Sequence, residues 1–112
     1  MIKWIAAVAA LVILMGYALF QLGAGGRLAA ELNRQHRSEV VLYSASWCSA
    51  CAATRQFLTD NRIPFVELDM EQDPQGSREF AQFGGHGIPL VLVRGRAIRG
   101  HQPRLLIQAL SP

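Results

Sequence analysis

The sequence predicts a small α/β domain with a four-stranded mixed sheet and three helices, preceded by one transmembrane helix. Two observations carry this prediction. Residues 4–22 form an N-terminal run without a charged side chain. After residue 38, short runs rich in β-forming residues alternate with helical stretches, in the order β-α-β-α-β-β-α. The chain has 112 residues, which suits one small domain.

The apolar run is long enough to cross a lipid bilayer. As a helix it would be about 28 Å long, close to the thickness of the hydrocarbon core. A cleaved signal peptide is the alternative, with Lys3 as its basic start and Leu-Gly-Ala at 22–24 as its cleavage site. That site has Leu where a small residue is preferred, and the run exceeds the usual signal core. We therefore expect residues 1–24 to be an uncleaved anchor of a single-pass protein, in a bacterial-type inner membrane.

Two orientations in the membrane are compatible with the flanking charges. Arg27, Arg34 and Arg37 follow the apolar run, and by the positive-inside rule they favour a cytoplasmic domain. A short basic tail before a single anchor resembles an uncleaved export signal, which would place the domain outside.

Residues 25–38 are predicted to be a juxtamembrane helical linker. The Gly-Ala-Gly-Gly sequence at 23–26 favours a flexible break. Leu28, Ala29 and Leu32 then fall on one face of a short helix. We expect this helix to be a spacer, and contact of its apolar face with the membrane is the alternative.

Residues 39–112 are predicted to form the folded domain. Residues 40–43 are a short apolar run typical of a buried parallel strand, and residues 65–69 form a second predicted strand, entered through Pro64. A helix at about 50–58 connects them, and this crossover requires the two strands to be parallel.

The second half of the domain is predicted from its caps and turns. Asp73 and Pro74 are typical of a helix start, and that helix would run to about residue 83. Alternating runs at 90–93 and 97–99 predict a hairpin of antiparallel strands. A last helix would begin at Pro103 and end at about residue 110.

The charges outside the apolar run are nearly balanced. Of the 11 Lys and Arg residues, only Lys3 precedes the run, so ten Arg stand against eight acids. This small, evenly spread excess argues against nucleic-acid binding. We therefore expect no nucleic-acid partner, and membrane lipid as the environment of the anchor.

The chemistry is predicted from the only two cysteines, Cys48 and Cys51. They lie at the junction of the first strand and the first helix, where a spacing of three brings both sulfurs to one face. The helix dipole and the unpaired N–H groups at the helix start favour a thiolate at Cys48, and so lower the pKa of that thiol. We expect Cys48 to attack a substrate disulfide and Cys51 to resolve the mixed disulfide.

Two other uses of the cysteines were weighed. Zinc would require further ligands, and His36, His86 and His101 have no ligand spacing to one another. A purely structural disulfide over so short a ring would constrain little of the unfolded chain. The strand-to-helix context favours redox chemistry, and we expect no metal site.

Three motifs resemble the glutaredoxin branch of the thioredoxin-fold family over about residues 39–110. They are VVLYSASWCSAC at 40–51, Gly-Ile-Pro-Leu-Val at 87–91, and Gly100 before the last helix. The resemblance implies a thioredoxin-like, glutaredoxin-type fold in which Pro89 is cis and faces the cysteines. It also implies that the Ile88 backbone pairs with an extended substrate, beside Gly100. Trp47, next to Cys48, is expected to form an apolar wall for substrate.

The sequence departs from the glutaredoxin pattern at several positions. Ser49 and Ala50 stand between the cysteines, where the family has Pro and an aromatic residue. Ala45 occupies a position that is commonly basic, and residues 101–103 lack the acid that holds glutathione. Leu42 stands where thioredoxin has a buried acid. Glutathione is a candidate reductant, beside a thioredoxin-type reductase system, and no tightly bound cofactor is expected.

Together these features predict a membrane-anchored thiol–disulfide oxidoreductase that reduces or exchanges protein disulfides by a dithiol mechanism. Two alternatives come from other functional classes. One is a glutaredoxin-like protein that binds an iron–sulfur cluster or another metal. The other is a non-catalytic, membrane-tethered adaptor that only recognises peptides.

Overall fold

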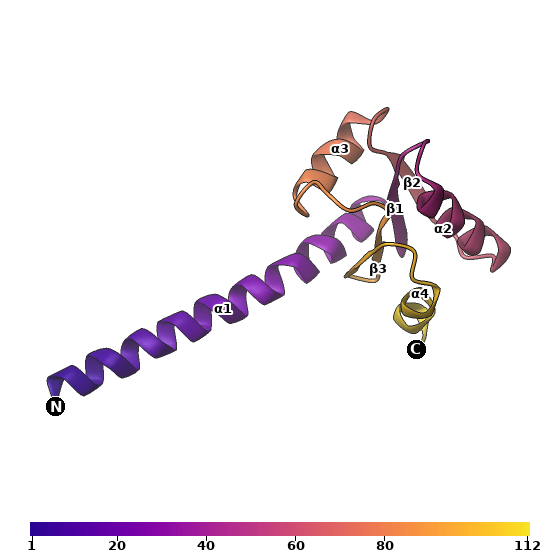
Figure 1. Cartoon of the computed structure of the whole chain (residues 1–112). Helices are drawn as coiled ribbons and strands as arrows, with labels where there is room; N and C mark the ends of the chain where they lie inside the picture. Colours follow the sequence, from indigo (N-terminus) through magenta and orange to yellow (C-terminus); the bar gives the residue numbers. More distant parts are fainter.

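A computed structural model of the chain describes residues 1–19 and 26–112. Figure 1 shows its elements in chain order. They are α1 (Ile2–Gln35), β1 (Val40–Ser44), α2 (Ser49–Asp60), β2 (Val66–Asp69), α3 (Pro74–Ala81), β3 (Leu90–Val93), β4 (Arg96–Arg99) and α4 (Pro103–Leu110). The predicted cleavage site at 22–24 and, apart from Gly26, the predicted break at 23–26 lie outside the described residues.

The four strands form one mixed sheet in the order β2-β1-β3-β4. β1 pairs with β2 in parallel and with β3 in antiparallel, and β3 pairs with β4 in antiparallel. The predicted order of elements and the predicted strand directions are therefore confirmed. β1 is a central strand, and every residue in it is buried, which explains its continuous apolar run.

Local chemistry sets the ends of the later elements. The Asp73 carboxylate accepts hydrogen bonds from the backbone N–H groups of Gln75 (2.9 Å) and Gly76 (3.3 Å), so it caps α3 as predicted. The hairpin turn consists of Arg94 and Gly95, whose φ angles are 47° and 84°. A two-residue turn of this kind matches the twist of the strands it connects. β4 consequently begins at residue 96, one residue earlier than predicted.

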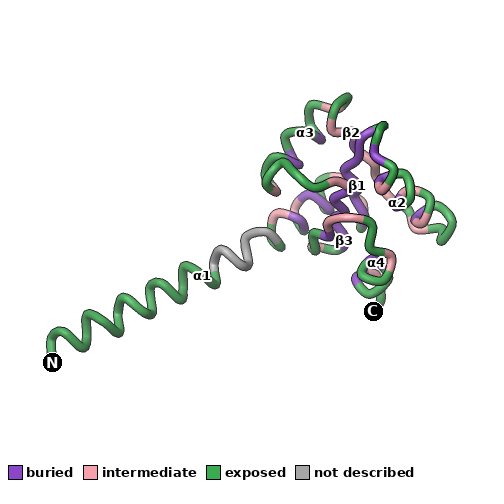
Figure 2. The backbone as a smooth tube through the Cα atoms, viewed as in Figure 1, coloured by how far each residue is buried: buried purple, intermediate pink, exposed green. Residues whose placement is uncertain are grey.

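The core lies in two layers, one on each face of the sheet. Alternate residues of β1 point to opposite faces, so Val41 and Tyr43 enter one layer while Val40 and Leu42 enter the other. The first layer is covered by α1 and α3, and the second by α2 and α4. In Figure 2 the buried backbone follows the sheet and the helix faces that contact it.

The C-terminal turns of α1 belong to this core. Ala29 and Leu32, two residues of the predicted linker face, are buried against β3 and β4. The buried Asn33 amide donates hydrogen bonds to the carbonyls of Ser38 (2.9 Å) and Leu92 (3.1 Å), and its oxygen accepts one from the Gly95 N–H (3.0 Å). The last turns of α1 thus pack on the sheet and cover sheet area that would otherwise be exposed.

The N-terminal part of α1 is apolar and exposed. Ile2–Leu19 is long and apolar enough to cross a membrane, and none of this stretch is buried in the molecule. By length and composition alone it fits either a membrane span or a signal sequence.

A buried carboxylate joins α1, β1 and α3. Glu79 accepts hydrogen bonds from the Tyr43 hydroxyl (2.6 Å) and Gln75 (2.8 Å), and lies 2.7 Å from His36 Nε2. Burial alone would raise the pKa of Glu79, but the hydrogen bonds from Tyr43, His36 and Gln75 outweigh it and lower that pKa. Burial and the bond to Glu79 raise the pKa of Tyr43.

We predict that Glu79→Gln flattens the acid dependence of stability. A carboxylate whose pKa is lower in the folded state stabilises the fold above its unfolded pKa, and this contribution is lost as the pH falls through the folded pKa. Between about pH 5 and pH 3, the free energy of unfolding should therefore fall less steeply in Glu79→Gln than in wild type. Denaturant unfolding of the full chain in detergent measures this, with exposed Asp60→Asn as the control. Parallel curves for wild type and Glu79→Gln would contradict the prediction.

Candidate active site

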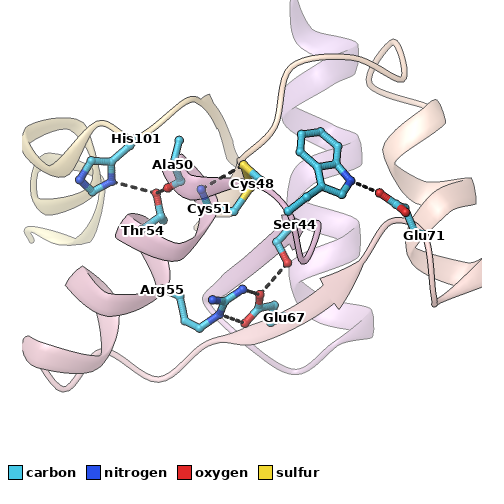
Figure 3. Close-up of a disulfide and its surroundings, with 10 residues drawn as sticks. Ser44, Cys48, Ala50, Cys51, Thr54, Arg55, Glu67, Glu71 and His101 are labelled. Atoms are coloured by element: carbon cyan, nitrogen blue, oxygen red, sulfur yellow. Dashed lines mark hydrogen bonds and ion pairs between the residues drawn. A yellow bond between two sulfur atoms is a disulfide. The ribbon is translucent and has the colours of Figure 1, made fainter.

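The two cysteines form a disulfide at the start of α2. Cys48 is the N-cap residue, Cys51 lies in the first turn, and their Cα atoms are 5.2 Å apart. Cys51 is fully buried, whereas Cys48 is 8% exposed. The outer sulfur is therefore the one that a substrate can reach. Figure 3 shows the pair between α2 and the loop that precedes it.

The chain folds into this cap because β1 ends at Ser44 and a tight turn follows. The Cys48 N–H donates to the Ala45 carbonyl (3.2 Å), and the Ala52 N–H donates to the Cys48 carbonyl (3.1 Å). The Cys51 N–H donates to Cys48 Sγ (3.1 Å). A thiolate formed at Cys48 on reduction would have this N–H and the positive end of the α2 dipole beside it.

A cis peptide bond joins Ile88 and Pro89, as the resemblance implied. Ile88 packs against the cluster formed by Ala45 and the two cysteines. Within residues 1–19 and 26–112, the Ile88 backbone has no hydrogen-bond partner. The Gly100 N–H donates to the Pro89 carbonyl (2.7 Å), so Gly100 holds the cis-proline loop in place.

Arg99 holds the loop before Ile88, a role that no sequence motif predicts. Its guanidinium donates to the carbonyls of Phe83 and His86, and to that of Gly87 at 3.5 Å. The loop glycines at 84, 85 and 87 have φ angles of 103°, 69° and 80°. These left-handed conformations explain why glycine is repeated there.

A groove of about 250 Å³ lies beside the cysteines. Its lining residues are Ala45, Trp47, Met70, Glu71, Phe80, Gly85, His86, Gly87 and Ile88. The Trp47 side chain, expected to be an apolar wall, is 70% exposed, and its indole N–H donates to the Glu71 carboxylate. Sequence reasoning missed Met70, Glu71 and Phe80 because they come from the β2–α3 segment, far from the motifs.

A second polar cluster lies under the active-site turn. Glu67 on β2 accepts hydrogen bonds from the Ser44 hydroxyl (2.6 Å) and from Arg55 Nε (2.7 Å). The hydrogen bond from Arg55 lowers the pKa of Glu67 against the effect of burial, and the same bond raises the pKa of Arg55. This cluster ties the end of β1 to α2 and β2, as Figure 3 shows.

The three histidines bind groups other than the sulfurs. His36 contacts Glu79, His86 Nδ1 lies 3.0 Å from the Gly84 carbonyl, and His101 Nδ1 lies 2.9 Å from the Thr54 hydroxyl. Among the residues that the structure describes, no group of three or more His, Cys, Asp or Glu side chains is placed to hold a metal ion.

These elements define a dithiol protein of the thioredoxin fold: a cysteine pair at a helix cap, packed against the residue before a cis-proline. The sequence model of the glutaredoxin family matches residues 40–98. The chain belongs to the glutaredoxin family.

Solved structures of this class share the fold. The thioredoxin-like protein BC3987 is 25% identical, with a TM-score of 0.57 over 63% of this chain and 99% of that protein. The glutaredoxin-like NrdH-redoxin from Escherichia coli is 19% identical, with a TM-score of 0.58 over 65% of this chain and 95% of that protein. A glutaredoxin from Archaeoglobus fulgidus is 19% identical, with a TM-score of 0.60 over 70% of this chain and 91% of that protein. The chain matches no curated protein sequence.

We predict that reduced Cys48 ionises at a lower pH than reduced Cys51, because Cys48 lies at the helix cap and Cys51 inside the helix. The rate of iodoacetamide alkylation against pH measures each thiol separately in Cys51→Ser and Cys48→Ser. The midpoint for Cys48 should lie at least about one pH unit below the ordinary thiol value of about 8.5. An ordinary or raised midpoint for Cys48 would contradict the prediction.

Proposed function

We propose that this protein is a membrane-anchored thiol–disulfide oxidoreductase that reduces protein disulfides through Cys48 and Cys51. The observation that supports the proposal most directly is the cysteine pair at the cap of α2, in which Cys48 is 8% exposed and Cys51 is fully buried. Membership of the glutaredoxin family supports the same chemistry.

In the first step the Cys48 thiolate attacks one sulfur of a substrate disulfide. The substrate S–S bond breaks, a Cys48–substrate disulfide forms, and the second substrate sulfur leaves as a thiolate that takes up a proton. The Cys51 N–H beside Cys48 Sγ stabilises the attacking anion.

In the second step Cys51 loses its proton and attacks Cys48 Sγ. The mixed disulfide breaks, the Cys48–Cys51 disulfide closes, and the first substrate sulfur leaves as a thiol. The substrate has then gained two electrons and two protons. The protein has lost two electrons and both thiol protons, the Cys48 proton having been released to solvent when the thiolate formed. A thiol donor restores the dithiol by the reverse exchange, either glutathione or a thioredoxin-type reductase system.

The cis-proline loop is suited to holding the substrate during this exchange. Because the N–H and C=O of Ile88 are unpaired within the described chain, they are open to an extended substrate segment. Pro89 fixes the direction of this loop, the Gly100 N–H holds the Pro89 carbonyl, and Trp47 lines the same groove as Ile88.

The N-terminal part of α1 supports anchoring in a membrane. An exposed apolar helix of this length is costly in water and stable in lipid. We infer a single-pass protein of a bacterial-type inner membrane, in which lipid surrounds the residues before the domain.

We predict different outcomes for the two cysteine variants. Cys48→Ser should abolish disulfide reduction, because it removes the attacking sulfur. Cys51→Ser should still attack but should accumulate mixed disulfides, because it removes the resolving sulfur. Reduction of a protein disulfide, followed with non-reducing gels and mass spectrometry, distinguishes the two. Full reductase activity in the double variant would exclude the proposed mechanism.

We predict that the chain remains in the membrane pellet after an alkaline carbonate wash, at its full mass of 12.3 kDa. Replacing Leu11 and Leu14 with Arg should release it, because charges at the bilayer centre are costly. A shorter, soluble wild-type product would instead identify a cleaved signal peptide. Labelling of intact cells with an impermeant thiol reagent, with and without prior reduction, then gives the side of the membrane and the resting redox state.

A further inference from the structure

The groove beside the cysteines is small and is lined by apolar side chains together with one carboxylate. At about 250 Å³ it lies below the range of about 300–1,000 Å³ that small-molecule sites occupy. It can therefore hold a single long side chain more readily than a whole cofactor. Its lining is mostly apolar and includes Trp47, Met70, Phe80 and Ile88, and its only acidic side chain is Glu71.

A guanidinium that holds the loop at the edge of the groove is already engaged. Arg99 binds three carbonyls of the 83–87 loop and does not line the groove. Because Glu71 contacts the indole N–H of Trp47, its carboxylate lies at the rim of an exposed aromatic side chain. Figure 3 places Glu71 to one side of the cysteine pair and His101 to the other, so the carboxylate marks one side of the site.

We propose that this groove binds an arginine or lysine side chain of the substrate protein, close in sequence to the substrate cysteine that Cys48 attacks. This inference rests on the proposed function and names its substrate class. The apolar stem of such a side chain would pack on Met70, Phe80 and Ile88. Its cationic head would meet the Trp47 ring and the Glu71 carboxylate, which attract cations by different interactions.

The groove lies close to Cys48, so the side chain it binds should come from a residue near the substrate cysteine in sequence. Trp47 is adjacent to Cys48 in the chain, and Ile88 both lines the groove and packs against the cysteines. A substrate segment extended along Ile88 advances about 3.3 Å per residue. With its cysteine at Cys48, a residue a few positions away therefore reaches the groove.

The test uses peptides that carry a reacting disulfide and differ at one position. Arg, Gln or Glu is placed in turn at each of three positions on either side of the cysteine. The second-order rate of thiol release is then measured with the reduced full chain in detergent. At one or two positions, Arg should react about two- to fivefold faster than Gln, and Glu should react more slowly. The effect should shrink at high ionic strength, because salt screens exposed charges.

Two variants distinguish an effect of the groove on the exchange rate from an effect of the protein's net charge. Glu71→Gln removes the charge and keeps an oxygen that can accept the Trp47 N–H, so the Arg-to-Gln rate ratio should fall, with only the Trp47 ring left to attract the cation. Asp60→Asn removes an exposed carboxylate from the far end of α2, which does not line the groove, and should leave the ratio unchanged.

The outcomes separate this inference from the proposed function. If wild type exchanges with the peptides but shows no preference for Arg at any position, the inference is wrong and the oxidoreductase remains. If the preference persists undiminished in Glu71→Gln, the Glu71 carboxylate does not attract the cation, and the inference is again wrong. If no peptide reacts, the proposed function itself fails.

Discussion

The active site depends on one contact, the backbone N–H of Cys51 pointing at the sulfur of Cys48. That contact exists because Cys48 caps α2, and Cys48 caps α2 because the central strand β1 ends four residues earlier at Ser44. The rest of the domain holds these two elements in register. β2 and β3 flank β1, and Glu67 fastens the end of β1 to α2. The reactivity of one sulfur is thus a property of the sheet as well as of the cysteine motif.

Much of the fold could be predicted from the sequence, because its signals are local. The buried run at 40–43, the Asp73 cap and the alternating runs around Gly95 each act over a few residues, and each predicted element is present. The fate of residues 25–38 was harder to predict. A short apolar face looks the same whether it contacts lipid or a sheet, and the burial of Leu32 depends on sheet area that no local pattern reveals.

Some residues of the candidate site could likewise be predicted from the sequence, and others could not. Cys48, Cys51 and Pro89 have chemically distinctive residue types, so their importance is visible in the sequence. Glu71 and Arg99 are ordinary surface types there, and only the fold brings one to the groove and the other to the loop carbonyls. At Ala45 and residues 101–103 the chain lacks charges that glutaredoxins commonly carry. Its charge beside the cysteines lies instead on Glu71, which lines the same groove as Ile88 of the cis-proline loop.

The packing of α1 into the core also limits how far the protein can reach. The buried Ala29 lies only seven positions after Leu22, the last residue of the predicted apolar run. Even a fully extended chain of that length covers only about 25 Å. In an anchored protein, Cys48 would therefore remain within a thin layer along the bilayer surface. Substrate proteins held at the membrane surface would encounter Cys48 at a high effective concentration, whereas soluble proteins in bulk solution would encounter it less often.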